Sequence, residues 1–172
     1  ITNASLLDEG TAAAEAMLMF YNHTKDPEKN TYLVSENCHP QTIEILKTRS
    51  KPIGIILKVI PTNEFQFGAT TFGALLQYPD TKGKVEDYTN TCKEAHLNNS
   101  FVCFATDLLA LSLIKAPGEM GADAAIGNAQ RFGVPMGNGG PHAAFFSTSD
   151  TFKRKIPGRI IGLTNDSNQK PA

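Results

Sequence analysis

A glycine- and proline-rich turn, residues 128–142, contains the residues best suited to hold a ligand. Glycine has no Cβ, so the backbone of such a turn can approach a bound molecule closely. Arg131, near the start of the turn, and His142, at its end, can donate hydrogen bonds to that molecule, and both are candidate cofactor-binding residues. Neither GxGxxG nor GxxxxGK(S/T), the two glycine patterns that bind nucleotide phosphates, occurs here. The alternative interpretation is a turn with a purely structural role.

A further candidate for cofactor binding is Thr11, which lies in a Gly10-Thr11 turn directly before an alanine-rich segment. The first N–H groups of a helix have no partner within the helix, and together with the Thr11 hydroxyl they could bind an anionic group. Asp8 and Glu9 would repel a phosphate at the same place. The alternative is an ordinary helix cap, with Asp8 or Thr11 accepting a hydrogen bond from the first turn.

Asp107 follows a strongly apolar segment, where a carboxylate can either reach a cofactor or cap a helix that begins at Leu108. The histidines, cysteines and carboxylates form no set with metal-ligand spacing, so we expect no metal site. The three cysteines, Cys38, Cys92 and Cys103, are odd in number and widely spaced. That pattern fits a reducing compartment better than a disulfide framework.

Charge and hydropathy argue against two classes of partner. The 172 residues include 16 Lys and Arg against 17 Asp and Glu, a net charge of -1, which gives no electrostatic reason to expect nucleic acid or an anionic membrane as a partner. No apolar run approaches the roughly 18 residues that a membrane span requires. The length suits one domain of ordinary size, which can bury a core without metals or disulfides.

The candidate residues must be positioned by alternating helices and strands. Helices are expected at 9–23, which is rich in alanine, at 84–97, which is amphipathic, and at 41–48 and 108–114. Strands are expected in the apolar or β-branched segments 31–35, 53–60, 72–78, 101–106, 122–126 and 143–147. Apolar strands separated by helices predict an α/β fold, a mostly parallel sheet with helices on both faces. Ligands of such folds bind beyond the carboxyl ends of the strands.

Several long segments of this sequence resemble the glycine decarboxylases (P-proteins) of the glycine cleavage system. These segments are residues 3–17, 38–42, 105–111, 117–119, 121–123, 130–137, 139–145 and 157–162. They follow one another in the order of the family and span nearly the whole chain. The similarity is weakest in 51–71, in 80–100 and after Asp166.

The resemblance implies that residues 1–166 are part of the large domain of a fold-type I pyridoxal-phosphate enzyme, and that a truncated polar tail follows at 167–172. Long members of the family consist of two similar halves, which are separate subunits in some organisms. The similarity here is to the amino-terminal half, and a site of its own for the cofactor is not expected in it.

The catalytic half of the family has a His-Lys pair before a comparable glycine-rich turn. Aligned on that pattern, Gln130 occupies the place of the lysine that forms the Schiff base with pyridoxal phosphate, and an amide cannot form one. The carboxylate that pairs with the pyridine nitrogen falls near Phe104, three residues before Asp107. We therefore assign no catalytic residue to this half.

For the whole enzyme, the resemblance implies that glycine condenses with pyridoxal phosphate, loses carbon dioxide and passes its aminomethyl group to the lipoylated H-protein. Pyridoxal phosphate would be bound by the other half. This half would pack against that catalytic carboxy-terminal half or subunit, within a homodimer or heterotetramer, and would be inactive by itself. The location implied is mitochondrial in a eukaryote and cytoplasmic in a bacterium, with no targeting segment visible. The alternative is a non-catalytic structural or interaction module derived from a pyridoxal-phosphate enzyme.

Overall fold

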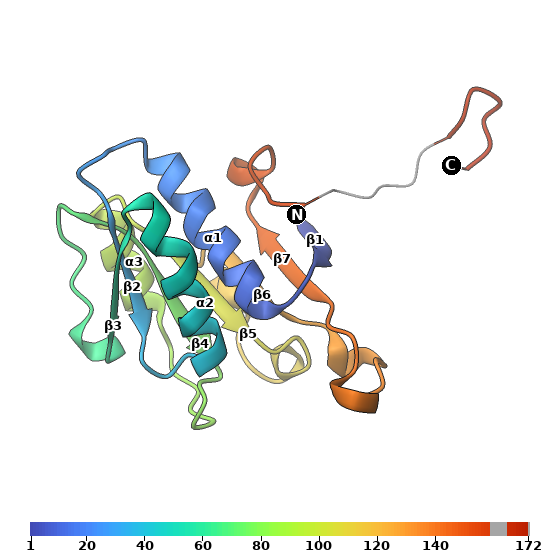
Figure 1. The fold of residues 1–172 in the computed structure, drawn as a ribbon, viewed down its shortest axis with the longest axis horizontal. Coiled ribbons are helices and arrows are strands. Elements are labelled where there is room, and N and C mark those ends of the chain that lie inside the picture. Colours follow the sequence, from blue (N-terminus) through green and yellow to red (C-terminus); the bar gives the residue numbers. More distant parts are fainter. Residues whose placement is uncertain (159–164, 172) are drawn as a thin grey trace.

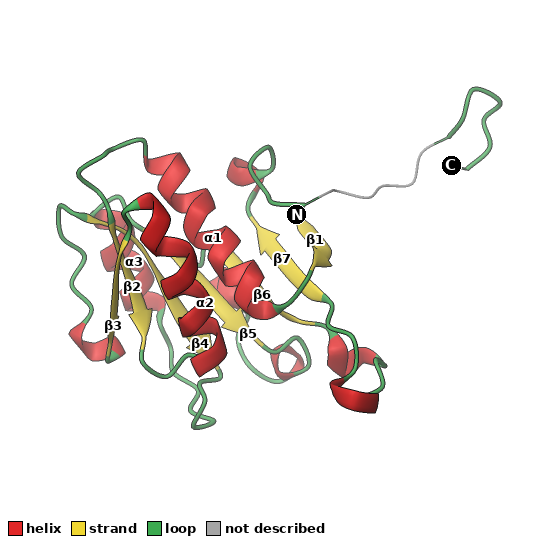
Figure 2. Ribbon diagram, in the orientation of Figure 1, coloured by secondary structure: helices red, strands yellow, loops and turns green. Residues whose placement is uncertain are grey.

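The fold is built on a seven-stranded sheet, seen in the computed structural model of the chain, which describes residues 1–158 and 165–171 (Figures 1 and 2). Its strands are β1 (Thr2–Leu6), β2 (Thr31–Ser35), β3 (Ile56–Ile60), β4 (Thr71–Tyr78), β5 (Phe101–Thr106), β6 (Ala124–Asn128) and β7 (Ala144–Thr148). They lie in the order β1-β7-β6-β5-β4-β2-β3. Residues 159–162, the last part of the family-like segment 157–162, lie outside the described residues.

Five neighbouring strands, β3, β2, β4, β5 and β6, are parallel, whereas β7 runs antiparallel to both β6 and β1. The carboxyl ends of the parallel strands therefore meet at one edge of the sheet. That edge is where the sequence predicted the ligand-binding residues to lie.

Alternate residues of the strands face two separate cores, because successive side chains of a strand point to opposite faces. On β2, Val34 packs in the core beneath α1 (Glu9–Thr24) and α2 (Pro40–Ser50), whereas Leu33 packs in the core beneath α3 (Thr89–Leu97). Figure 2 shows α1 and α2 together on one face, with α3 behind the sheet. The predicted arrangement, a mostly parallel sheet with helices on both faces, is confirmed.

Helix α1 places residues of its first turn at this edge of the sheet. It begins where the Asp8 carboxylate accepts a hydrogen bond from the Thr11 N–H at 2.7 Å, and it ends at Lys25, which has a left-handed φ of 52°. The alternative interpretation of this turn, an Asp8 cap, is thus what the structure contains. Alanines at 12, 13, 14 and 16 are fully buried, which lets the helix lie close to the sheet.

Three expected elements differ clearly from the structure in extent or type, and one strand was not expected. Helix α3 begins at Thr89 rather than 84, because the Asp80 carboxylate accepts hydrogen bonds from the Lys82 and Lys84 N–H groups and holds the preceding residues in a turn. Residues 108–114 contain only a 3-10 turn, Ala110–Ser112. The strand expected from residue 53 starts at Ile56, after Gly54 with φ 76°. β1 was not predicted at all.

Candidate active-site pocket

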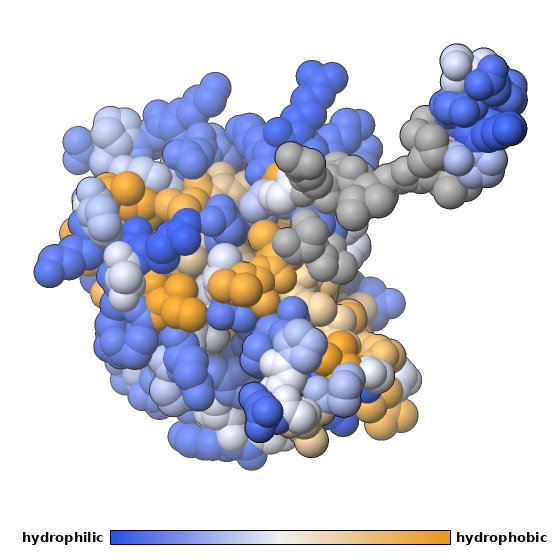
Figure 3. Space-filling model, turned by 45° about the vertical axis from the view of Figure 1, so that its right-hand side comes forward, coloured by the Kyte–Doolittle hydropathy of each residue, from blue (hydrophilic) through white to orange (hydrophobic). Residues whose placement is uncertain are grey.

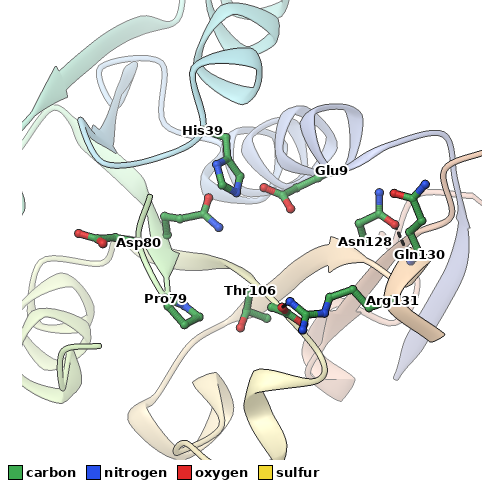
Figure 4. Close-up of a pocket in the computed structure, with 10 residues that line it drawn as sticks. Glu9, His39, Pro79, Asp80, Thr106, Asn128, Gln130 and Arg131 are labelled. Atoms are coloured by element: carbon green, nitrogen blue, oxygen red, sulfur yellow. Dashed lines mark hydrogen bonds and ion pairs between the residues drawn. The ribbon is translucent and has the colours of Figure 1, made fainter. Parts of the chain in front are cut away.

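A pocket of about 330 Å³ opens at the carboxyl ends of β4, β5 and β6 (Figure 4). Side chains from the start of α1 and from the residue before α2 close it on one side, and Thr106 and Arg131 lie on the other. Its lining residues are Glu9, His39, Gln77, Pro79, Asp80, Thr106, Asp107, Asn128, Gln130 and Arg131. A second pocket of about 490 Å³ shares Glu9, His39 and Asn128 with it and extends to His142.

Three polar atoms in the lining of the first pocket are buried and have no hydrogen-bond partner among the described residues: Glu9 Oε1, Gln77 Oε1 and Thr106 Oγ1. Gln77 is 5% exposed and Thr106 is 2% exposed. A buried polar group without a partner typically costs about 1–3 kcal/mol. Their presence around one cavity indicates a place shaped to receive hydrogen bonds from a further molecule.

The Glu9 carboxyl has an unusual protonation equilibrium. Burial, and then the nearby Asp8 and Asp107 carboxylates, raise its pKa from 4.5 to about 7. Negative charge at this point of the pocket is therefore not compensated by the described residues around it. Perturbed carboxyl groups in clefts are typical of functional sites.

Asp107 caps a turn and also forms an ion pair at the pocket. Its Oδ1 accepts a hydrogen bond from the Leu109 N–H at 2.9 Å, which caps the turn after β5, and its Oδ2 pairs with Arg131 Nη1 at 2.7 Å. Asp107 therefore lines the pocket directly after β5, whereas Phe104 lies within β5 and packs in the core under α3. The carboxylate that follows β5 and reaches the pocket is therefore Asp107.

Gln130 and His142 hold the glycine-rich turn together. Gln130 Nε2 donates to the Gly139 carbonyl at 2.9 Å, and the Gln130 N–H donates to Asn128 Oδ1 at 2.7 Å. His142 Nδ1 lies 2.7 Å from Asn128 Nδ2. Gln130 and Arg131 line the first pocket and His142 the second, so the structure brings these predicted residues to one edge of the sheet.

Thr11 lines neither of these two pockets. It is in the first turn of α1, its N–H is taken by Asp8, and it is absent from the lining of both pockets in the described part of the chain. The pocket residues at the start of α1 are instead the N-cap Asp8, Glu9 and Gly10. Two carboxylates at a helix start disfavour a phosphate, although the helix N-terminus alone would attract one.

Among the described residues, neither a lysine in the pocket lining nor a metal-binding group is found. The described lining contains no lysine. Within residues 1–158 and 165–171, no group of three or more His, Cys, Asp or Glu is placed to hold a metal ion. The three cysteines are buried and unpaired, and burial raises the pKa of each thiol, so they are poor nucleophiles.

Gln77 and Thr106 were not identified as site residues from the sequence. Gln77 is the last but one residue of its predicted strand, and Thr106 is the last of its own. One signal for Gln77 was available, a single amide within the otherwise apolar segment 72–78. Thr106 has no comparable signal, since threonine is an ordinary strand residue. Glu9 was considered only as a residue that repels phosphate.

The strand order, the antiparallel β7 and a pocket at the carboxyl edge define the class: the large domain of the fold-type I pyridoxal-phosphate enzymes. A cystathionine gamma-lyase from Lactobacillus plantarum superposes with a TM-score of 0.63 at 14% identity, over 91% of this chain and 40% of its own. A methionine gamma-lyase from Micromonospora echinospora superposes with a TM-score of 0.69 at 11% identity, over 90% of this chain and 41% of its own. The predicted fold class is confirmed, and at these identities the likeness concerns the fold alone.

Within this class, the chain belongs to the glycine cleavage system P-protein family, whose sequence model matches residues 1–172. It is 52% identical over 172 residues to the glycine dehydrogenase (decarboxylating) of Synechocystis and to the mitochondrial one of Dictyostelium discoideum. A crystal structure of glycine decarboxylase (P-protein) in inhibitor-bound form has a TM-score of 0.87 and 32% identity, over 99% of this chain and 40% of that one. All of this chain matches these two dehydrogenases but spans only 17% of their length. Among the described residues, no helix is long and apolar enough to cross a membrane.

Proposed function

We propose that this chain is part of the non-catalytic half of a protein that decarboxylates glycine and passes the aminomethyl group to the lipoylated H-protein. Membership of the P-protein family supports the reaction. The observation that carries the role of this half is the pocket lining, which contains no lysine among the described residues and has Gln130 and Arg131 at the start of its glycine-rich turn.

Pyridoxal phosphate does not fit the residues of this pocket. The cofactor supplies an electron sink to enzymes of this class and is held by a lysine amine, whereas Gln130 offers an amide that already donates to the Gly139 carbonyl. Its phosphate would meet Asp8 and Glu9 at the start of α1. We propose that the cofactor is bound by the other half, and that residues 1–166 are a part of the large domain that supports it, with 167–172 as a polar tail.

The surface of the chain supports packing against a partner half. Phe132 is 61% exposed and Met136 is 80% exposed, and both belong to the glycine-rich turn next to the pocket. Figure 3 shows hydrophobic atoms on the lower right of this face, where residues 130–140 lie. Apolar groups gathered beside a site are typical of an interface. The assembly would be a homodimer if both halves share one chain and a heterotetramer if they do not.

The relatives with curated names include mitochondrial proteins of Dictyostelium and Flaveria and proteins of cyanobacteria. We propose a mitochondrial location if the source is a eukaryote and a cytoplasmic one if it is a bacterium.

Release of labelled carbon dioxide from carboxyl-labelled glycine tests the proposed function. The full-length protein is expected to release it in the presence of lipoylated H-protein, because the other half supplies the cofactor. The 172-residue chain with added pyridoxal phosphate is expected to release none. Release by this chain alone would contradict the assignment of a non-catalytic half, and no release by the full-length protein would favour the alternative, an interaction module that has lost catalysis.

A further inference from the structure

The pocket at the carboxyl ends of β4, β5 and β6 has features of a binding site that the absence of a lysine does not explain. Gln77 Oε1 and Thr106 Oγ1 are buried without a partner on two adjacent parallel strands, where Gln77 pairs with Ala105 and Tyr78 with Thr106. Glu9 Oε1 faces the same cavity from the first turn of α1. A region that served only as packing would gain stability from apolar side chains at these positions.

The charges around the cavity select the kind of ligand. Three carboxylates line it, those of Glu9, Asp80 and Asp107. The guanidinium of Arg131 is paired with Asp107, and Asp80 Oδ1 accepts the N–H groups of Lys82 and Lys84. Glu9 has no such partner in the part of the chain that the structure describes, which leaves an acceptor there without a positive charge beside it. An anion would instead meet Glu9 and, through the adjoining pocket, Asp8.

We propose that this pocket binds a small organic cation with several N–H donors, of the alkylammonium or guanidinium class. The N–H groups of such a ligand would donate to Glu9 Oε1, Gln77 Oε1 and Thr106 Oγ1, the three atoms that lack partners. A volume of about 330 Å³ lies within the range of small-molecule sites. The inference rests on the proposed function in one respect: the pocket must hold no covalently bound pyridoxal phosphate.

The affinity for a cation should depend on pH, because the cation prefers the ionised Glu9. Several titratable and charged groups lie around Glu9 on the neighbouring elements. They are Asp8 just before α1, Cys38 and His39 before α2, Asp80 after β4, Cys103 on β5, Asp107 after β5, Arg131 after β6 and His142 before β7. With a Glu9 pKa of about 7 in the free protein, protonation competes with the ligand below neutrality. We expect binding about tenfold tighter at pH 8 than at pH 6.

The test is equilibrium dialysis of radiolabelled methylguanidinium against the full-length protein. This probe is a poor amine nucleophile and so does not mimic the substrate at the cofactor. We expect one site per copy of this chain, and at least about tenfold weaker binding in Gln77→Leu and in Thr106→Val. Both variants remove an unpartnered polar atom, so they should unfold at the same or a higher urea concentration than the parent.

Glu9→Gln provides a second test that does not depend on the other variants. This variant should bind the probe more weakly at pH 8, and its affinity should be the same at pH 6 and pH 8. The matched control is Glu94→Gln at an exposed position on α3, which should change neither the affinity nor its dependence on pH. Absence of binding, or binding that Gln77→Leu and Glu9→Gln do not alter, would overturn the inference and leave the proposed function intact. Covalent pyridoxal phosphate in this pocket would instead overturn the proposed function.

Discussion

Replacement of Gly127 by alanine is expected to lower the free energy of unfolding by about 3 kcal/mol or more. Gly127 lies in β6, in register with Thr106 of β5. A Cβ at this position would overlap the carbonyl oxygen of Thr106 and come within 2.7 Å of the Phe145 ring. The backbone of a central strand cannot move away without breaking the β5–β6 pairing, which also positions Thr106 and Asn128 at the pocket.

Urea denaturation of the 172-residue chain measures this effect. Gly118→Ala is the matched control, because a Cβ built on Gly118 meets no described atom within 4 Å beyond the adjacent backbone, and its φ is not left-handed. We expect that control to stay within about 1 kcal/mol of the parent. Equal stabilities of the two variants would show that β5 and β6 are not packed as closely as described.

Glu9→Gln is expected to stabilise the chain by up to about 3 kcal/mol at pH 8 and to have almost no effect at pH 4. The folded-state pKa of Glu9 is raised from 4.5 to about 7, chiefly by burial. The folded chain thus binds the Glu9 proton more tightly than the unfolded chain does. Between these two pKa values the folded state holds more protons, so stability falls as pH rises from about 4.5 to 7. Glutamine resembles the protonated carboxyl and has no such cost.

The measurement is the free energy of unfolding in urea at several pH values, for the parent and the variant. Their difference should grow from pH 4 to pH 7 and then remain constant. Glu94→Gln, on the exposed face of α3, should give a difference that does not vary in this way. A Glu9→Gln difference that is flat across the range would mean that Glu9 is ionised at an ordinary pKa and is exposed to solvent.

The sequence was sufficient to predict the sheet because the apolar strands are nearly continuous. Residues 31–35, 72–78 and 101–106 contain enough consecutive apolar side chains to require burial on both faces, as observed. The antiparallel direction of β7 could not be predicted in this way, because an apolar segment has the same pattern whether its strand runs parallel or antiparallel. β1 was missed because Thr2–Leu6 mixes polar and apolar residues and lies at the end of the sheet.

The site was predictable in location but only partly in its residues. Arg131 and His142 were found because their turn has an unusual composition, and Gln130 was found from the family resemblance; all three line a pocket. Gln77, Thr106 and Glu9 could be identified only from the structure. Burial in three dimensions is what distinguishes an unpartnered polar atom from an ordinary exposed one. Thr11 was chosen for its helix start, but Asp8 takes its N–H and Glu9 reaches the cavity instead.

Reduction of the full-length protein with borohydride, followed by peptide mapping, tests the central claim most directly. Borohydride fixes pyridoxal phosphate to the lysine that holds it as a Schiff base. Because Gln130 is an amide and no lysine lines the described pocket, the phosphopyridoxyl group is predicted on a peptide outside residues 1–172. A labelled lysine within this chain would contradict the account.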